Sequence, residues 1–268
     1  MSLSPEQKAQ YEREGFLAVR EVLTVEEVQA IRDTLSTYLR AGLDMLRRGE
    51  VPESDSVTYQ GVSIQLEPAV LSGKVRVEDP AFAARKIWNL YGNDELVTRL
   101  VQDERILSLV TSVLGDEVWF FADKALLKPP HIGVEKPWHQ DIPYFPFEPK
   151  APYLHVAVWI ALDDATAENG CMQYISGSHL WGNLTTETTW TESVSHLAVD
   201  EARIDLSQAV LVEAKAGDIV LHDGMVLHYS APNRSPYPRW AMILDFISVR
   251  ARYTGEGQPP FPRLRYAR

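Results

Sequence analysis

Cysteine is almost absent from this chain of 268 residues, because Cys171 is the single example. One thiol excludes an internal disulfide and a zinc site built from several thiolates, and its apolar neighbours favour a buried packing residue. Long apolar runs are lacking too, since none approaches the roughly 20 residues needed to cross a bilayer. The start, residues 1–15, is polar and has no apolar signal-peptide core. We therefore expect a cytoplasmic protein without a membrane partner.

Basic residues are scarce relative to acidic ones. Lysine and arginine total 26 against 37 aspartate and glutamate residues, which gives a net charge of −11. Nucleic-acid backbones are bound mainly by clustered Lys and Arg, so this balance argues against DNA or RNA as a partner. It also favours a small metabolite over a highly anionic substrate, although a local basic pocket can override the global charge. We expect a monomer or a homodimer that acts on a small molecule.

The chain is long enough to bury a substantial core, because 45% of its 268 residues are hydrophobic. No internal repeat or long low-complexity stretch divides it. We therefore expect one domain over residues 1–268. Within it, residues 1–115 are expected to be mainly helical with cover loops, residues 116–250 to form a β core, and residues 251–268 to form a C-terminal tail.

Helical patterns dominate the first part of the chain. Residues 4–14 are typical of a short helix, and the sequence TVEE at 24–27 is a capping box that opens a longer one. Apolar residues at helical spacing predict its buried stripe, at Val28, Ile31, Leu35, Leu39, Leu43 and Leu46. Residues 51–80 mix Pro, Ser, Gly and acidic residues, which indicates loops over a cavity. Residues 94–114 predict another amphipathic helix, ended by Gly115.

Strand patterns take over after Gly115. Runs rich in Val, Ile, Phe, Tyr and Trp predict strands at 118–127, 153–162, 171–175, 209–213, 218–222, 225–229 and 240–249. Short strands behind a helical front predict a mainly β fold with a helical layer (α+β). A double-stranded β-helix, the cupin-like jelly roll, fits best, with the N-terminal helices packed on one sheet. Residues 180–207 lack a clear period and are typical of a binding loop or lid.

The segment WHQD at residues 138–141 carries the first candidate metal ligands. Alternate residues of an extended strand share a face, so His139 and Asp141 point together into a cavity while Gln140 points away. A distant histidine completes such a set, and both His222 and His228 are available. Two imidazoles and one carboxylate on one face of a metal leave open positions opposite, as in non-heme Fe(II) oxygenases. The same residue types can also hold zinc with a bound water.

Four segments resemble the phytanoyl-CoA dioxygenase family of Fe(II)- and 2-oxoglutarate-dependent oxygenases. They are LKPP leading into WHQD at 127–141, VWIALDDAT at 158–166, ENGCMQYISGSH at 168–179, and GD at 217–218 with HYSAPNRS at 228–235. The resemblance covers about residues 11–262. It implies a jelly roll that uses Fe(II), 2-oxoglutarate and O2. The reaction it implies is hydroxylation of an unactivated C–H bond of a small-molecule metabolite, with release of succinate and CO2.

In this resemblance His139, Asp141 and His228 match the family's catalytic iron ligands. The match favours His228 over His222, which is then expected beside the ligands or in the cavity wall. Asp141 also argues against halogenation, because halogenating relatives replace this carboxylate with a small residue.

The resemblance also assigns cosubstrate contacts. Arg239 matches the arginine that pairs with the far carboxylate of 2-oxoglutarate, since a guanidinium fork binds a carboxylate through two hydrogen bonds. Ser230 matches its hydroxyl partner, and Lys86 and Trp159 match further cosubstrate contacts. Lys124 falls where relatives often have methionine near the cosubstrate, so the local pocket differs from theirs.

Residues close to the metal motif in the sequence are predicted to line the part of the cavity that binds the substrate. Tyr144, Phe145 and Phe147 follow WHQD directly and can form an apolar wall beside the reacting centre, with ordinary packing under a loop as the alternative. His155 lies in an apolar run and is expected in the core or the pocket wall. His222 completes this predicted set.

Two other classes of function compete with the oxygenase. The first is a zinc hydrolase, but that function does not explain the presence of Arg239 and Ser230. A non-catalytic cupin-like binding protein predicts loss of the metal and cosubstrate residues, which are all present. Within the oxygenase class, desaturation, cyclisation and epimerisation use the same iron site, and no motif separates them from hydroxylation.

Overall fold

The computed structural model describes residues 2–50, 56–184, 187–191 and 194–266. Its α-helices are α1 Pro5–Glu14, α2 Val25–Arg47, α3 Pro68–Leu71, α4 Glu95–Val101 and α5 Glu104–Leu114. Its strands are β1 Phe16–Val19, β2 Ser56–Tyr59, β3 Val62–Leu66, β4 Ala84–Trp88, β5 Glu117–Lys128, β6 Lys136–His139, β7 Phe147–Glu148, β8 His155–Ala161, β9 Met172–Ile175, β10 Glu187–Thr191, β11 Val194–Ala198, β12 Ala209–Val212, β13 Ile219–Asp223, β14 His228–Ser230, β15 Arg239–Ser248, β16 Arg252–Tyr253 and β17 Arg263–Arg265.

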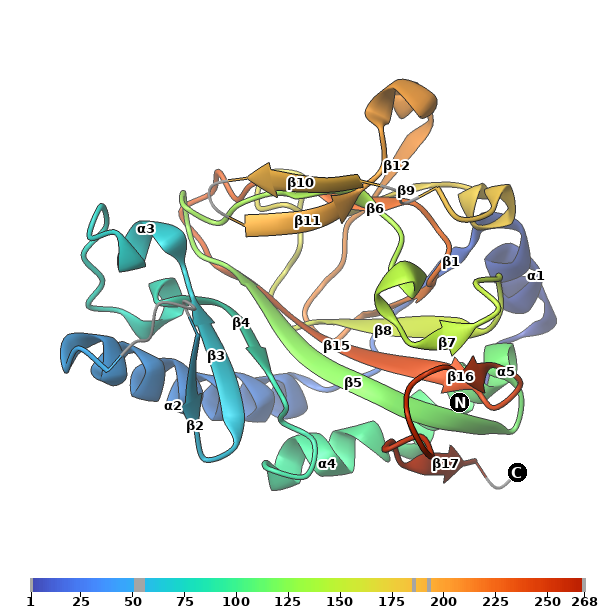
Figure 1. Ribbon diagram of the computed structural model, residues 1–268, viewed down its shortest axis with the longest axis horizontal. Helices are drawn as coiled ribbons and strands as arrows, with labels where there is room; N and C mark the ends of the chain where they lie inside the picture. The colour runs from blue at the N-terminus through green and yellow to red at the C-terminus, as the bar shows by residue number, and fades with distance from the viewer. Residues whose placement is uncertain (1, 51–55, 185–186, 192–193, 267–268) are drawn as a thin grey trace.

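Two antiparallel sheets face each other across the middle of the molecule (Figure 1). Among the described residues the larger sheet runs β1-β13-β8-β15-β5-β4-β3-β2, with β17 beside β5, and the smaller runs β12-β9-β14-β6. The chain passes back and forth between them, from β5 to β6, from β8 to β9, and from β13 through β14 to β15. This alternation is the double-stranded β-helix, so the predicted jelly roll is confirmed.

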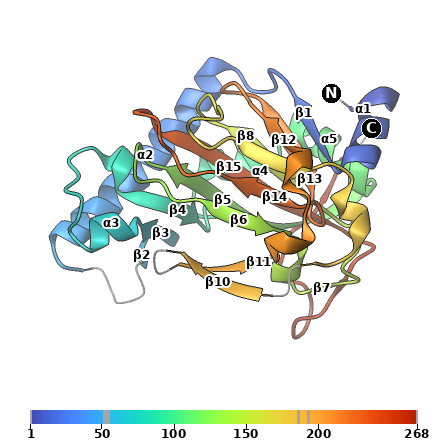
Figure 2. The same cartoon turned by 90° about the horizontal axis from the view of Figure 1, so that it is seen from above.

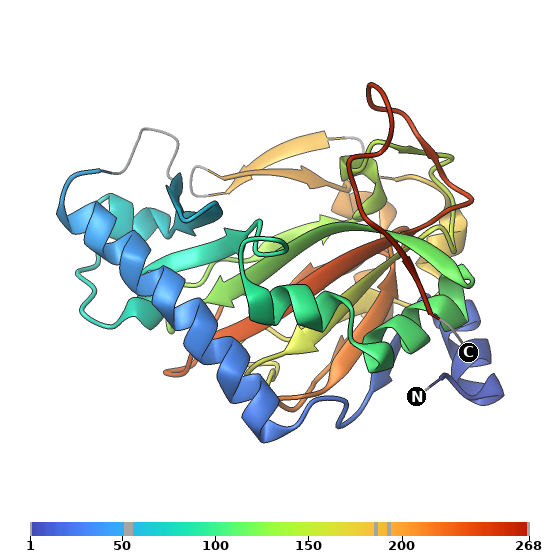
Figure 3. The ribbon, with the colours of Figure 1, turned by 90° about the horizontal axis from the view of Figure 1, so that it is seen from below.

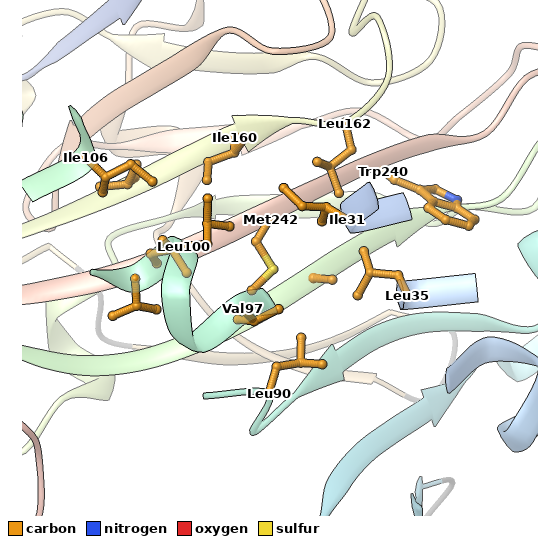
Figure 4. Close-up of a cluster of buried hydrophobic side chains, with 14 of the residues drawn as sticks. Ile31, Leu35, Leu90, Val97, Leu100, Ile106, Ile160, Leu162, Trp240 and Met242 are labelled. Atoms are coloured by element: carbon orange, nitrogen blue, oxygen red, sulfur yellow. The ribbon is translucent and has the colours of Figure 1, made fainter. Parts of the chain in front are cut away.

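The strand β15 shows how one sheet separates the core from the site. Its even positions, from Trp240 to Phe246, lie in the hydrophobic core beneath the sheet, with Ile160 of β8, with Leu162 just after β8, and with the helices (Figure 4). Its odd positions, from Arg239 to Asp245, face the space between the two sheets, because successive side chains of a strand point to opposite faces. A polar site therefore sits directly above an apolar core.

The helices cover the outer face of the larger sheet (Figure 3), as the sequence predicts. Thr24 caps α2 through the expected capping box, and all but the last of the predicted stripe residues are buried. The single helix predicted over 94–114 is wrong. The structure has α4 and α5 there, because the carboxylate of Asp103 accepts a hydrogen bond from the Arg105 amide and starts a new helix.

Residues 51–80 differ from the loops that the composition indicates. Residues 51–55 lie outside the described part, but β2 and β3 form a hairpin that joins the larger sheet through β4, and α3 follows. In the predicted lid, 180–207, β10 and β11 pair with each other, and β11 lies beside β6 (Figure 2). Residues 185–186 and 192–193 are outside the described part. A lid role for either segment, and the single-domain organisation, stay predictions.

The described helices include none that is both long and apolar enough to span a membrane.

Candidate metal centre and cosubstrate cavity

Two paired strands of the smaller sheet bring the predicted metal ligands together. His139 ends β6 and lies opposite His228, which begins β14, so the centroids of their rings are 4.0 Å apart. Asp141 follows two residues after His139. One ligand atom from each of the three side chains lies within 4.8 Å of the other two, and in the described residues this is the group able to hold a metal ion. The group includes His228 and leaves out His222.

The two histidines are held in the tautomer that a metal requires. Nδ1 of His139 lies 2.8 Å from the Pro137 carbonyl oxygen, and Nδ1 of His228 lies 3.0 Å from that of Val226. A carbonyl oxygen only accepts, so each Nδ1 carries the hydrogen and donates it. Each Nε2 is then free of hydrogen and available as a metal ligand. The Nε2 atoms of His139 and His228 lie 3.6 Å and 3.7 Å from a carboxylate oxygen of Asp141.

The charges of the group also fit a divalent cation. Burial lowers the pKa of His139 well below its usual value, and burial lowers the pKa of His228 to about 4. Burial alone would favour the protonated form of Asp141, but His228, His222 and Lys124 together hold its pKa well below the usual range. Two neutral imidazoles and an ionised carboxylate are therefore ready at neutral pH, and metal binding needs these states.

His222 supports the site from behind Asp141. Its Nε2 lies 3.2 Å from Asp141 Oδ2, and its Nδ1 lies 3.1 Å from the Tyr174 hydroxyl. Because a carboxylate only accepts, Nε2 carries the hydrogen and Nδ1 accepts from Tyr174. A buried chain of two hydrogen bonds thus fixes Asp141. The sequence placed His222 near the ligands but gave no sign of Tyr174, which is brought in by the pairing of β9 with β14.

A cavity of about 1030 Å³ opens between the sheets at this group. Most of the predicted site residues line it, namely His139, Asp141, His228, Arg239, Ser230, Trp159, Lys86, Lys124, Tyr144, Phe145 and His222. Two do not. Phe147 packs one layer behind, against Phe121 and Tyr253, and His155 lies behind Phe145, where its Nε2 contacts Asp245.

Arg239 has the features of a buried carboxylate-binding residue. It is 2% exposed, and neither its Nε nor its Nη1 has a hydrogen-bond partner in the described part of the chain. Its guanidinium lies 5.8 Å from the ring centroid of Trp159, whose Nε1 is also buried without a partner. Burial lowers the pKa of Arg239 to about 10, which leaves it charged at neutral pH. Unmatched buried donors are costly, so these atoms fit a carboxylate ligand such as one end of 2-oxoglutarate.

Lys128 is a buried lysine at the Arg239 end of the cavity, and sequence reasoning left it without a role. Burial and then the charge of Arg239 lower the pKa of Lys128 well below its usual value. Its Nζ lies within hydrogen-bonding distance of the carbonyl oxygens of Val134, Ser230 and Ala231, at 2.6, 3.2 and 2.7 Å. These bonds tie the end of β5 to the end of β14 and so fix Ser230. In the sequence, Lys128 is the lysine that directly follows the predicted strand 118–127 and precedes Pro129.

Comparison with known proteins agrees with this geometry. The model of the phytanoyl-CoA dioxygenase (PhyH) family matches residues 11–241. The phytanoyl-CoA dioxygenase domain-containing protein 1 homolog of Dictyostelium discoideum is 30% identical over 263 residues, which cover 92% of each chain. The ectoine dioxygenase of Bordetella bronchiseptica is 27% identical and aligns over 92% of this chain and 76% of its own.

A solved structure shares the fold. The apo form of the non-heme monooxygenase ThoJ superposes with a TM-score of 0.69 and 25% identity, over 97% of this chain and 83% of its own. The family model covers most of the sequence, and His139, Asp141 and His228 form a group that could hold a metal ion. The chain therefore belongs to the phytanoyl-CoA dioxygenase family of Fe(II)- and 2-oxoglutarate-dependent oxygenases.

Proposed function

We propose that this protein uses Fe(II), 2-oxoglutarate and O2 to hydroxylate a C–H bond of a small-molecule metabolite. The observation that carries the proposal is one cavity that holds both a buried metal-binding group and Arg239, whose Nε and Nη1 are buried without partners. The metal group alone suits several kinds of enzyme. The guanidinium of Arg239 adds hydrogen-bond donors and a positive charge, which bind one carboxylate of a dicarboxylate cosubstrate. Relatives named as dioxygenases support the same conclusion.

Each residue has a separate task in this proposal. His139, Asp141 and His228 hold iron from one side and leave the other side open to the cavity. Arg239 binds the far carboxylate of the cosubstrate, and Ser230, two residues after His228 on β14, faces the same cavity. Bound iron and 2-oxoglutarate supply oxidative decarboxylation to succinate and CO2, coupled to oxidation of the substrate by O2. The chain itself orients the reactants and excludes water.

Other outcomes at the same iron site are desaturation, cyclisation and epimerisation, and hydroxylation is our default among them. A zinc hydrolase explains the metal group but leaves the buried donors of Arg239 without a ligand. Cytoplasmic location and a monomeric or homodimeric state stay predictions.

An anaerobic titration tests the proposal directly. Fe(II) and then 2-oxoglutarate are added to the apo protein while the visible spectrum is followed. We expect a metal-to-ligand charge-transfer band, which appears only when the cosubstrate chelates the iron. Succinate release in air then identifies substrates. A folded protein that binds iron and gives no band would contradict the proposal and favour the hydrolase.

We expect His222→Ala to weaken Fe(II) binding by about 10- to 100-fold, the usual cost of losing a partner that orients a metal ligand. The substitution leaves Asp141 Oδ2 without the hydrogen bond that holds it. The measurement is Fe(II) affinity by competition with a chelator, which does not depend on turnover. His222→Gln keeps an N–H donor and should restore part of the affinity.

The exposed His131 provides the matched control, because His131→Ala removes an imidazole outside the cavity. It should leave Fe(II) affinity unchanged. If His222→Ala matched this control, the hydrogen bond to Asp141 would have no part in metal binding.

A further inference from the structure

The register of the larger sheet places the groups along the cavity in a fixed order. Arg239 lies opposite Lys128, and six residues further along β15 Asp245 lies opposite Ala157, which itself pairs with His222. His222 contacts Asp141, so Asp245 and the metal group lie toward the same end of the cavity, away from Arg239. A cosubstrate held between Arg239 and the metal group would occupy the Arg239 side of the cavity. The Asp245 end would then be left free.

Lys124 occupies this free end with a fixed ammonium group. Its Nζ lies 2.8 Å from Asp245 Oδ2, and the other carboxylate oxygen of Asp245 lies 3.1 Å from His155 Nε2. Asp245 is fully buried, and Lys124 lines the cavity. Asp245 takes one of the three N–H donors of Lys124, and no other described residue accepts from it. Two donors therefore remain for a ligand. Burial by itself lowers the pKa of Lys124, but the carboxylates of Asp245 and Asp141 raise it above its usual value. The Lys124 side chain therefore stays positively charged at neutral pH.

A second ammonium group, on Lys86, lies on the neighbouring strand. Lys86 pairs in register with Leu126, two residues from Lys124, and its Nζ lies 4.8 Å from the ring centroid of Trp88. No carboxylate in the described part of the chain forms an ion pair with it. Burial, followed by repulsion from Lys124, lowers the pKa of Lys86 to about 8. A half-buried cation without an anion, beside another cation, is stabilised by a negatively charged ligand.

An apolar surface adjoins these cations. The ring of Phe145 lies 5.9 Å from Lys124 Nζ, and its centroid is 4.5 Å from that of Phe121, which is 4.8 Å from that of Phe261. All three rings line the cavity. The metal end thus offers a positive group next to an aromatic wall, which suits a ligand with an anionic head and an apolar body.

We propose that Lys124, assisted by Lys86, binds an oxyanion of the substrate, in the first instance a carboxylate, while the apolar body of the substrate lies against Phe121, Phe145 and Phe261. The inference rests on the proposed function and names its substrate class. It replaces the cosubstrate role that the family resemblance suggests for the two lysines. The local charge of the cavity here overrides the net negative charge of the chain.

The test uses the full chain loaded anaerobically with Fe(II) and 2-oxoglutarate. The probes are 3-phenylpropanoate, its uncharged amide 3-phenylpropanamide, and inorganic phosphate, each titrated by calorimetry. We expect the wild-type protein to bind the acid at least 10-fold more tightly than the amide. Lys124→Met, which introduces the residue that relatives often carry, should remove this preference and leave the affinity for 2-oxoglutarate within 2-fold. Lys124→Arg should keep the preference.

Each outcome has a separate meaning. Equal binding of acid and amide, or no saturable binding of either the acid or phosphate, overturns the inference. If Lys124→Met binds 2-oxoglutarate more weakly and binds 3-phenylpropanoate with unchanged affinity, the inference is overturned and Lys124 belongs to the cosubstrate site. Phosphate binding that depends on Lys124 supports the site and identifies a phosphorylated substrate. Absence of the charge-transfer band in the wild-type protein is a failure of the proposed function itself, and it is seen before any probe is added.

The affinity for the acid should also fall as the pH rises from 7 to 9.5. Lys86 loses its proton as the pH passes its lowered pKa of about 8, whereas Lys124 stays protonated. The charged groups that act on Lys86 are Lys124, Asp245, Arg85 and Lys136, and burial also lowers the pKa of Lys136 to about 8. We expect a severalfold loss in the wild-type protein and a smaller loss in Lys86→Met, which leaves Lys136 and the Lys124–Asp245 pair intact. A wild-type loss no larger than that of the variant would remove Lys86 from the site.

Discussion

Asp141→Ala is expected to abolish 2-oxoglutarate turnover and to weaken Fe(II) binding by more than about 100-fold, since losing even an outer partner of a metal ligand costs 10- to 100-fold. Asp141 is the one anionic member of the metal group. Without it, the buried imidazoles of His139 and His228 are neutral ligands with nothing to balance the charge of the ion. The measurements are Fe(II) affinity by chelator competition and succinate release.

Asp141→Asn is the companion variant, because it keeps an oxygen ligand and the size of the side chain while removing the charge. We expect an affinity between those of the wild-type protein and Asp141→Ala. Circular dichroism and thermal unfolding of the metal-free proteins show whether the fold survives. An Fe(II) affinity in Asp141→Ala close to that of the wild-type protein would place the metal elsewhere.

Arg239→Ala should weaken 2-oxoglutarate binding by about 30-fold or more, because truncating one partner of a buried charge pair costs about 2 to 5 kcal/mol. The substitution removes Nε and Nη1, the donors that have no partner among the residues that the structure describes. The intensity of the charge-transfer band at increasing cosubstrate concentration gives the affinity. Fe(II) affinity should stay at the wild-type value, since Arg239 is not in the metal group.

Arg239→Lys separates charge from geometry. Lysine keeps the positive charge but lacks the planar fork that binds a carboxylate through two hydrogen bonds, so we expect an intermediate affinity. An unchanged 2-oxoglutarate affinity in Arg239→Ala would remove this residue from the cosubstrate site and leave its buried donors to be explained by another ligand.

Local patterns in the sequence predicted the main helix and the strands β5, β8, β9 and β12–β15, but not β1–β4 or β6. The strand predicted at 240–249 corresponds to β15 at Arg239–Ser248, and the capping box predicted at 24–27 marks the start of α2. These signals are local, because propensity, capping and apolar spacing act over a few residues. The break between α4 and α5 was missed because both helices continue one apolar pattern, and the cap by Asp103 is a short interruption within it.

Partners that come from distant strands were harder to predict. Tyr174 and Asp245 lie in apolar strands, and their contacts with His222 and Lys124 depend on which strands pair and in which register. Register is a long-range property, so a single sequence carries little information about it. A charged residue inside an otherwise apolar strand is the available signal. Asp245 has it, within the run WAMILDFIS, and its carboxylate is paired with Lys124 and His155.

The two faces of β15 have a consequence for how this enzyme can change. Alternate positions divide the strand between the core, with Trp240 and Met242, and the cavity, with Arg239, Ile243 and Asp245. Inserting or deleting one residue would exchange the faces, placing an indole above the iron site and a guanidinium in the apolar core. Single substitutions at the odd positions leave the core untouched. New substrate preferences can therefore arise along this strand one residue at a time, while its length stays fixed.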